Sequence, residues 1–270
     1  MDNRLNYIRL LESDSIYVIR EVAAQFENPV LLFSGGKDSL VMLHIARKAF
    51  WPAKIPFTLL HIDTGHNFAE TLQCRDKFVE NTGIRLMVAY VQDTIKSGKA
   101  VEDIGYKASR DVLQKIMLMD TIEKFNIDAV VTGARREDEN NQSKERFFSI
   151  RDEFGRWDPK NQRTELWNIF NGRIKPGEHF RVFPLSNWTE MDVWQYILQE
   201  NLDMPSLYFS HDRDCFIRDG VIYAYSDFIK LKTGEKVQNL HVRFRTVGDM
   251  TNSKATLSKA RNVKEIIDEV

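Results

Sequence analysis

A short segment of the chain combines the residue types that bind a phosphate group. It consists of Ser34, Gly35, Gly36, Lys37, Asp38 and Ser39, in that order. The two glycines let the backbone turn sharply and bring consecutive N–H groups close to a ligand. Lys37 adds a positive charge, the two serine hydroxyls can hydrogen-bond phosphate oxygens, and a helix beginning near Ser39 would direct its positive dipole end at the same point. The segment therefore predicts a nucleotide-binding loop, whereas the alternative is an ordinary Gly-Gly turn capped by Asp38.

A second polar group, Asp63 with Gly65, ends the apolar segment 57–62. Ligands of open α/β sheets bind at the carboxyl ends of the strands, so we expect Asp63 to meet the nucleotide and Gly65 to permit its close approach. The alternative is a strand-end turn in which Asp63 caps the next helix. His66 is the only histidine that we place near this point, and we expect it to serve in packing.

Two adjacent arginines, Arg135 and Arg136, follow Gly133 at the end of another apolar segment. Each carries a charge that needs a partner, which makes the pair a poor purely structural feature. Guanidinium groups clamp phosphate or sulfate through bidentate hydrogen bonds that also offset developing charge. We therefore predict catalytic roles for Lys37, Arg135 and Arg136 and a nucleotide contact for Gly133. Further basic residues follow in the polar connection, namely Lys144, Arg146 and Arg151, and some of these are surface charges.

The elements that must hold these residues alternate between strand and helix. Apolar residues at helical spacing predict helices over 4–26, 39–50, 68–81 and 111–125. Short apolar runs predict strands over 29–33, 57–62, 85–91 and 128–132. This alternation predicts an α/β fold with a doubly wound, mostly parallel sheet.

The composition of the chain becomes more polar after Gly133. Residues 134–179 form a polar connection of the kind that is usually functional or mobile. Order resumes with a strand over 180–185 and a helix that opens at Thr189, with Asp192 in a capping arrangement and Trp188 and Trp194 as core residues. Strands over 221–225 and 241–246 and a helix over 256–270 follow. We predict a nucleotide-binding domain over 1–190 and a smaller C-terminal extension, a partner and lid region, over 191–270.

Composition narrows the class of protein. The 270 residues are 43% hydrophobic and 29% charged, the balance of a globular enzyme, and the formal net charge of −1 lacks the basic excess typical of nucleic-acid binding. No apolar run reaches the roughly 20 residues of a membrane helix, and the N-terminus has no signal-peptide pattern. Two separated cysteines, Cys74 and Cys215, indicate a reduced cytoplasmic setting and exclude a cysteine-built metal cluster.

The SGGKDS loop lacks the spacing of a Walker loop and resembles the PP-loop of ATP pyrophosphatases, which transfer AMP and release pyrophosphate. The wider chain resembles the small catalytic subunits of bacterial heterodimeric ATP sulfurylases, the sulfate adenylyltransferase subunit 2 family, within the PAPS reductase-like superfamily. The matching strings lie at residues 20–24, 34–39, 60–65, 133–136, 144–146, 149–152, 157–163, 181–190 and 242–246. They span about nine-tenths of the chain.

The resemblance implies a reaction of sulfate assimilation and cysteine biosynthesis, in which ATP and sulfate give adenosine 5′-phosphosulfate and pyrophosphate. It implies a GTPase large subunit as partner, a triphosphate held by the loop, and Mg²⁺ bridging the leaving pyrophosphate. Arg135 and Arg136, with Lys144 and Arg146, would then contact sulfate.

The chain also departs from the family pattern. Asn140 and Gln142 stand where basic residues are expected, and residues 249–254 differ after Gly248. The family usually continues beyond Val270 with a basic tail. The resemblance implies that the last two differences act on docking of the GTPase or on a lid.

Three alternatives remain at this point. A phosphoadenosine-phosphosulfate reductase shares the fold and the segment from Trp188 to Trp194, but its thiol chemistry needs a reactive cysteine, typically in a C-terminal Glu-Cys-Gly stretch. Here Cys215 lies between Asp214 and Phe216. A related PP-loop enzyme would adenylylate a different acceptor. A non-catalytic subunit would bind nucleotide and regulate the GTPase.

Overall fold

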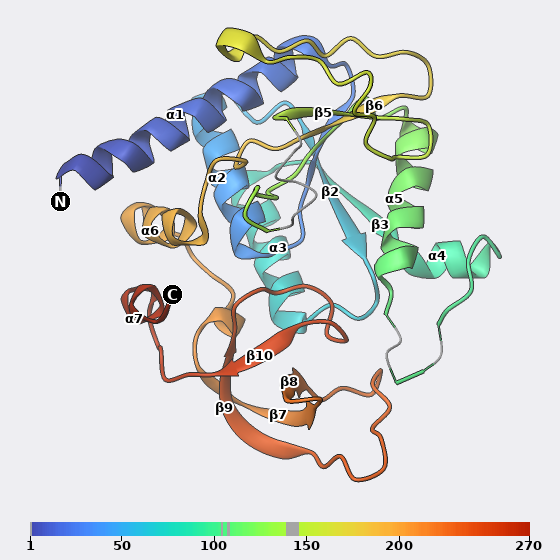
Figure 1. The fold of residues 1–270 in the computed structure, drawn as a ribbon, viewed down its shortest axis with the longest axis vertical. Helices are drawn as coiled ribbons and strands as arrows, with labels where there is room; N and C mark the ends of the chain where they lie inside the picture. The colour runs from blue at the N-terminus through green and yellow to red at the C-terminus, as the bar shows by residue number, and fades with distance from the viewer. Residues whose placement is uncertain (1, 104, 107–108, 139–145) are drawn as a thin grey trace.

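The computed structural model describes residues 2–103, 105–106, 109–138 and 146–270, and Figure 1 shows a sheet with a small barrel beneath it. The six-stranded sheet has the order β3-β2-β1-β4-β6-β5. Its strands are β1 (Pro29–Leu32), β2 (Thr58–Asp63), β3 (Leu86–Tyr90), β4 (Ala129–Val131), β5 (Phe148–Arg151) and β6 (His179–Val182). Neighbouring strands pair in parallel except β5, which pairs antiparallel with β6 at the edge.

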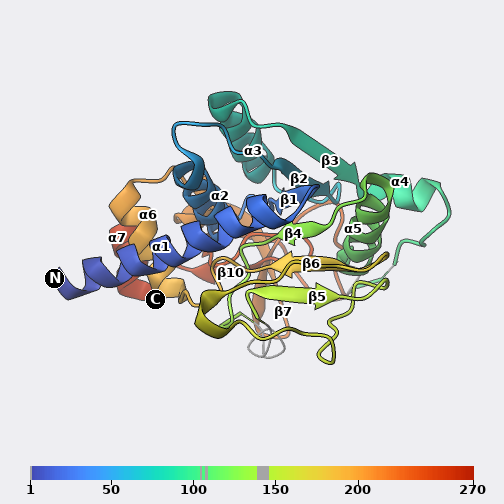
Figure 2. The ribbon, with the colours of Figure 1, turned by 90° about the horizontal axis from the view of Figure 1, so that it is seen from above.

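Helices cover both faces of this sheet because successive strand residues point to opposite sides. Leu31 of β1 packs in the core with helices α1 (Asp2–Gln25), α2 (Lys37–Phe50) and, at its margin, α3 (Ala69–Thr82), whereas Val30 packs with α5 (Asp111–Phe125). Figure 2 shows α1 and α2 on one side and α5 on the other, with the short α4 (Val91–Lys96) beside it. The predicted doubly wound α/β fold is therefore confirmed.

The helix α6 (Glu190–Glu200) begins where the sequence predicts. The Thr189 hydroxyl accepts from the Asp192 N–H at 3.1 Å, and the Asp192 carboxylate accepts from the Thr189 N–H at 2.9 Å. This reciprocal cap satisfies donors that have no partner inside the helix. Trp188 and Trp194 are buried in the core, as predicted.

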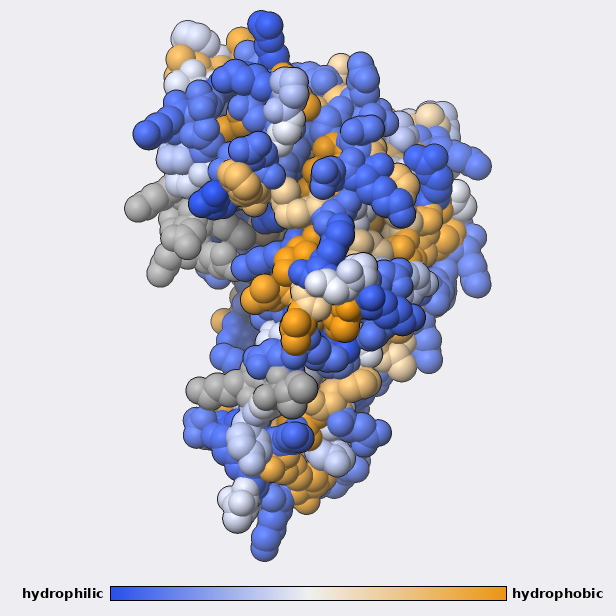
Figure 3. All heavy atoms as spheres, turned by 90° about the vertical axis from the view of Figure 1, so that its right-hand side faces the viewer, coloured by the Kyte–Doolittle hydropathy of each residue, from blue (hydrophilic) through white to orange (hydrophobic). Residues whose placement is uncertain are grey.

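A small closed barrel lies below the carboxyl ends of the parallel strands (Figure 1). It consists of β7 (His211–Arg218), β8 (Val221–Ala224), β9 (Gln238–Phe244) and β10 (Lys254–Leu257), and α7 (Val263–Glu269) follows it. Viewed from the side of α4 and α5, the molecule is narrower at the barrel than at the sheet, and apolar atoms gather near the junction (Figure 3). None of the helices in the described part of the chain is both long enough and apolar enough to cross a membrane.

One sequence prediction is wrong here, and two strands were not predicted. The helix expected over 256–270 is shorter, because Thr256 pairs with Arg243 in the barrel and Asn262 caps α7. The strand β7 was not predicted, and neither was β5, which lies inside the polar connection over 134–179. Each of these strands is stabilised by pairing with a distant segment, which local patterns do not reveal. The division at residue 190 stays a prediction.

Candidate nucleotide-binding site

The predicted loop joins β1 to α2 at the carboxyl edge of the sheet. Gly36 is the N-cap of α2, and Lys37 is its first residue. Gly35 has φ +77°, and a Cβ there would lie 2.3 Å from the Thr71 side chain, so this position requires glycine. Inside the loop the Ser39 hydroxyl donates to the Gly36 carbonyl at 2.9 Å, and this fixes the first turn of the helix.

The end of β4 presses against the same turn. A Cβ on Gly133 would lie 2.9 Å from the carbonyl carbon of Asp38 and 3.1 Å from the nitrogen of Ser39. Both are backbone atoms of α2, so no side-chain rotation would relieve the contact. Gly133 thus allows two chain segments to meet at close range, and this contact holds the start of α2 against the sheet.

Lys37 is the cation at the centre of the site. Its side chain is only 1% exposed. Its Nζ lies 3.2 Å from Asp38 Oδ2 and 4.0 Å from Glu190 Oε1, and it donates to the carbonyl oxygen of Arg245 at 3.4 Å. Lys37 is thus buried beside two carboxylates at the N-terminus of α2.

Arg135 lies beside Lys37 and reaches the same carboxylate. Its Nε is 3.0 Å from Asp38 Oδ1, although the angle is not that of a hydrogen bond, and its two terminal nitrogens contact Glu137 at 3.1 Å and Asp138 at 2.6 Å. Burial raises the pKa of Asp138 above its usual range, against the opposing effect of Arg135. Arg135 therefore contacts the loop through Asp38, and its predicted role as an anion clamp stays a prediction.

Arg136 contacts a different set of residues from Arg135. Its Nη1 donates to the side-chain oxygen of Asn187 at 2.7 Å, and its guanidinium group lies 5.5 Å from the ring centre of Phe147. Both of these contacts are to neutral groups, whereas Arg135 is paired with three carboxylates. Arg136 also lies near Glu165, where it opposes the rise in the pKa of that carboxyl that burial causes, so among the described residues it is less fully paired with carboxylates than Arg135.

Three residues of the C-terminal half, Tyr208, Glu190 and Arg245, lie against the loop, and we predicted no role for any of them from the sequence. The Lys37 N–H donates to the hydroxyl oxygen of Tyr208 at 2.7 Å, so this backbone donor of the loop already has a hydrogen-bond partner within the protein. Glu190 Oε2 accepts from Arg245 Nη2 at 2.8 Å. Glu190 directly follows the predicted cap at Thr189, which is the one signal that could have placed it near the site.

Asp63 and its neighbours stand at the end of β2. The Asp63 carboxylate accepts from the Gly65 N–H at 2.7 Å, which is a strand-end turn, and Gly65 has φ +73°. His66 is buried, with its ring centre 4.0 Å from that of Phe228 in a stacked arrangement. Burial and the nearby Arg110 lower the pKa of His66, so the ring is neutral at pH 7 and serves in packing.

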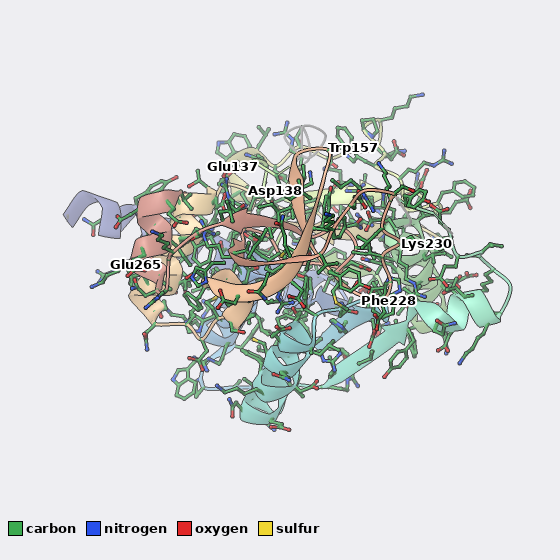
Figure 4. The ribbon with its side chains drawn as sticks, turned by 90° about the horizontal axis from the view of Figure 1, so that it is seen from below. Glu137, Asp138, Trp157, Phe228, Lys230 and Glu265 are labelled. Carbon is green, nitrogen blue, oxygen red and sulfur yellow. The ribbon has the colours of Figure 1, made fainter. Side chains whose placement is uncertain are left out.

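Of the remaining basic residues predicted to contact sulfate, Arg146 is described by the structure and Lys144 is not. Arg146 is exposed just before β5, and within the described ranges no contact links it to Lys37 or Arg135. Lys144, with Asn140 and Gln142, lies outside the described residues. Figure 4, seen from the barrel side, shows Glu137 and Asp138 close together and Phe228 and Lys230 at the far end.

Comparison with known proteins identifies the family. The model of the phosphoadenosine phosphosulfate reductase domain matches residues 28–255. Sulfate adenylyltransferase subunit 2 of Mycolicibacterium gilvum is 53% identical over 265 residues, which cover 98% of this chain and 85% of that protein. This chain belongs to the sulfate adenylyltransferase subunit 2 family. The family member from Mycobacterium tuberculosis is 53% identical over 266 residues, with the same coverage.

Solved structures share the fold at much lower identity. Candida glabrata FMN adenylyltransferase in complex with ATP superposes with a TM-score of 0.54 at 12% sequence identity, covering 94% of this chain and 89% of that one. A likeness at this level establishes the architecture and leaves the chemistry to the residues of the site. The family membership implied by the sequence strings is confirmed.

Proposed function

We propose that this chain is a sulfate adenylyltransferase, which transfers AMP from ATP to sulfate and releases pyrophosphate. The observation that carries the proposal is the loop at the start of α2, where Lys37 and Arg135 converge on Asp38. A glycine-rich turn opening a helix at the carboxyl edge of a parallel sheet is a phosphate-binding arrangement. The 53% identity to sulfate adenylyltransferase subunit 2 of M. gilvum supports sulfate as the acceptor.

The reaction is a substitution at the α-phosphorus. A sulfate oxygen forms a bond to that phosphorus while the bond from the phosphorus to the bridging oxygen of the β-phosphate breaks, and the electron pair leaves with pyrophosphate. Lys37 stabilises the charge that develops on the phosphates, and Arg135 keeps the loop in position through Asp38. Arg136 orients sulfate. Catalysis rests on positioning and charge stabilisation, without a covalent protein intermediate.

Mg²⁺ is proposed to enter with the nucleotide. Among the residues that the structure describes, no group of three or more histidines, cysteines and carboxylates could hold a metal ion. Mg²⁺ is commonly held by substrate phosphates, water and only one or two carboxylates, so the absence of such a cage in the described part is compatible with a metal held mainly by ATP. Its chemistry there is to neutralise charge on the leaving pyrophosphate.

A second subunit is part of the proposal, since the relatives are named as subunit 2. We propose that it is a GTPase, that GTP hydrolysis drives the unfavourable formation of the mixed anhydride, and that the pair acts in the cytoplasm. The C-terminal extension, residues 191–270, is proposed to carry the partner and lid functions.

The environments of the two cysteines do not favour reductase chemistry. Burial raises the pKa of both the Cys74 and the Cys215 thiols, and Cys215 is enclosed in the core. A raised thiol pKa disfavours the thiolate that such a reaction needs. Neither cysteine of this chain therefore has the environment of a nucleophile.

The test is sulfate-dependent release of pyrophosphate from ATP, measured with and without the partner GTPase and GTP. We expect release to depend on sulfate and to accelerate with GTP. Lys37→Met should abolish it, while Lys77→Met should not, because Lys77 is an exposed lysine of α3 paired with Asp203. Release without sulfate dependence would favour another acceptor. ATP binding without turnover, in the presence of partner and GTP, would favour a regulatory subunit.

A further inference from the structure

One connected network of charged side chains surrounds the loop. Its cations are Lys37, Arg135 and Arg245, and its carboxylates are Asp38, Glu137, Asp138 and Glu190. The carboxylates outnumber the cations in this network. ATP brings about four further negative charges to the same place, which Mg²⁺ offsets in part, so its phosphate oxygens compete with these carboxylates for the cations.

Of the two carboxylates that contact Lys37, Glu190 is farther from it than Asp38 is. Its Oε1 is 4.0 Å from the Lys37 Nζ, which is an electrostatic contact, whereas Asp38 lies at 3.2 Å and is also paired with Arg135. Glu190 Oε2 is held by Arg245 at 2.8 Å. One carboxylate is thus shared between the central lysine and an arginine that follows β9.

The charge on Glu190 persists at neutral pH. Burial raises the pKa of Glu190, but Lys37 and Arg245 more than offset this effect and hold the pKa below its usual range. Its side chain is 17% exposed, so water screens the contact with Lys37 only in part. The backbone N–H of Glu190 donates to Glu137 at 2.8 Å, which ties the start of α6 to the network.

We propose that Glu190 sets the affinity of the loop for nucleotide by competing with phosphate oxygens for Lys37, and that Arg245 weakens this competition by binding the other carboxylate oxygen. The inference rests on the proposed function, since it takes ATP as the ligand of the loop. Glu190 and Arg245 are both remote from the loop in sequence, and α6 and β9 bring them to it.

Substitutions at the two residues should act in opposite directions. Glu190→Gln keeps the shape and removes the competing charge, so the Kd for α,β-methylene-ATP with Mg²⁺ should fall about tenfold. Arg245→Gln frees Glu190 for Lys37, so the same Kd should rise several-fold. In the double variant the effect of Arg245→Gln should shrink markedly, because the carboxylate that it releases is gone.

Glu235→Gln is the matched control. Glu235 pairs with Arg218 at 2.7 Å, and its described contacts, to Arg218 and Lys232, do not touch the loop. It should leave the Kd unchanged. Thermal unfolding of each variant reports stability separately, and a purely structural role for Glu190 would lower the unfolding temperature without tightening nucleotide binding.

The outcomes separate the two proposals. If the wild-type chain binds the analogue, Lys37→Met abolishes binding and Glu190→Gln fails to tighten it, competition by Glu190 is overturned while the nucleotide site stands. Equal effects of Arg245→Gln in both backgrounds would also overturn it. Failure of the wild-type chain to bind the analogue at all would overturn the proposed function.

Discussion

Gly133→Ala is the sharpest test of how the loop is held. The added Cβ would lie 2.9 Å from the carbonyl carbon of Asp38, 3.0 Å from its oxygen and 3.1 Å from the nitrogen of Ser39. Carbon atoms prefer to be about 3.5 Å or more apart, so the start of α2 and the end of β4 must separate by roughly half an ångström. Overpacking of this kind costs about 1–3 kcal/mol. Gly133 does not have a positive φ, so the effect is steric and not conformational.

The assay combines thermal unfolding with pyrophosphate release. A loss of 1–3 kcal/mol lowers the unfolding midpoint by about 2–4 °C per kcal/mol in a chain of this size. Because a 1 Å displacement of reacting groups can cost about 100-fold in rate, half of that should lower kcat about tenfold. Gly105→Ala is the control, since nothing lies within 4 Å of a Cβ there and Gly105 also lacks a positive φ. Equal midpoints and rates for the two variants would refute the reasoning.

Three further predictions concern Arg135 and Glu190 of the charged network and Tyr208, which contacts the loop. Arg135→Ala should lower the free energy of unfolding by about 2–4 kcal/mol as well as activity, because it leaves partly solvated carboxylates unpaired; an unchanged unfolding midpoint would show that Arg135 acts only on substrate. Tyr208→Phe removes the acceptor of the Lys37 N–H and should cost about 1 kcal/mol in urea unfolding, so a neutral result would contradict that hydrogen bond. The pKa of Glu190 is lower in the folded chain than its ordinary 4.5, so its contribution to stability is present above that pH and is lost as the pH falls below it. The stability difference between wild type and Glu190→Gln, measured by unfolding at pH 7 and pH 3.5, should therefore shrink at the lower pH.

Local patterns predicted much of the half of the chain that forms the parallel sheet. Apolar runs predicted β1 to β4 within a few residues, and helical spacing predicted α5 at its actual bounds, Asp111–Phe125. The cap at Thr189 was also predictable, because a hydroxyl and a carboxylate three residues apart satisfy the first turn without help from elsewhere. The glycine-rich loop belongs to the same class. Its position after a buried strand and before a helix can be predicted from adjacent residues alone.

The barrel was much harder to predict. Its strands are partly exposed, and β7 begins with four consecutive polar or charged residues, 211–214, so it shows no strand alternation that could be detected. The predicted final helix, 256–270, overlaps the last two residues of β10, and pairing with β8 and β9 makes this segment a strand. Strand propensity depends on such cross-strand neighbours more than on the strand itself.

The sequence by itself determined the glycine-rich loop, whose phosphate binding stays a prediction, and the family, since both are carried by short strings of contiguous residues. Only the tertiary structure decided how the loop is held and which charges surround it. Tyr208, Glu190 and Arg245 reach Lys37 because the chain between α6 and β9 returns across the carboxyl edge of the sheet. The end of β4 packs directly on the start of α2. This packing brings Arg135 to the Asp38 carboxylate and leaves no room for a side chain at Gly133. Contacts between distant segments depend on packing, and no spacing within one segment encodes them.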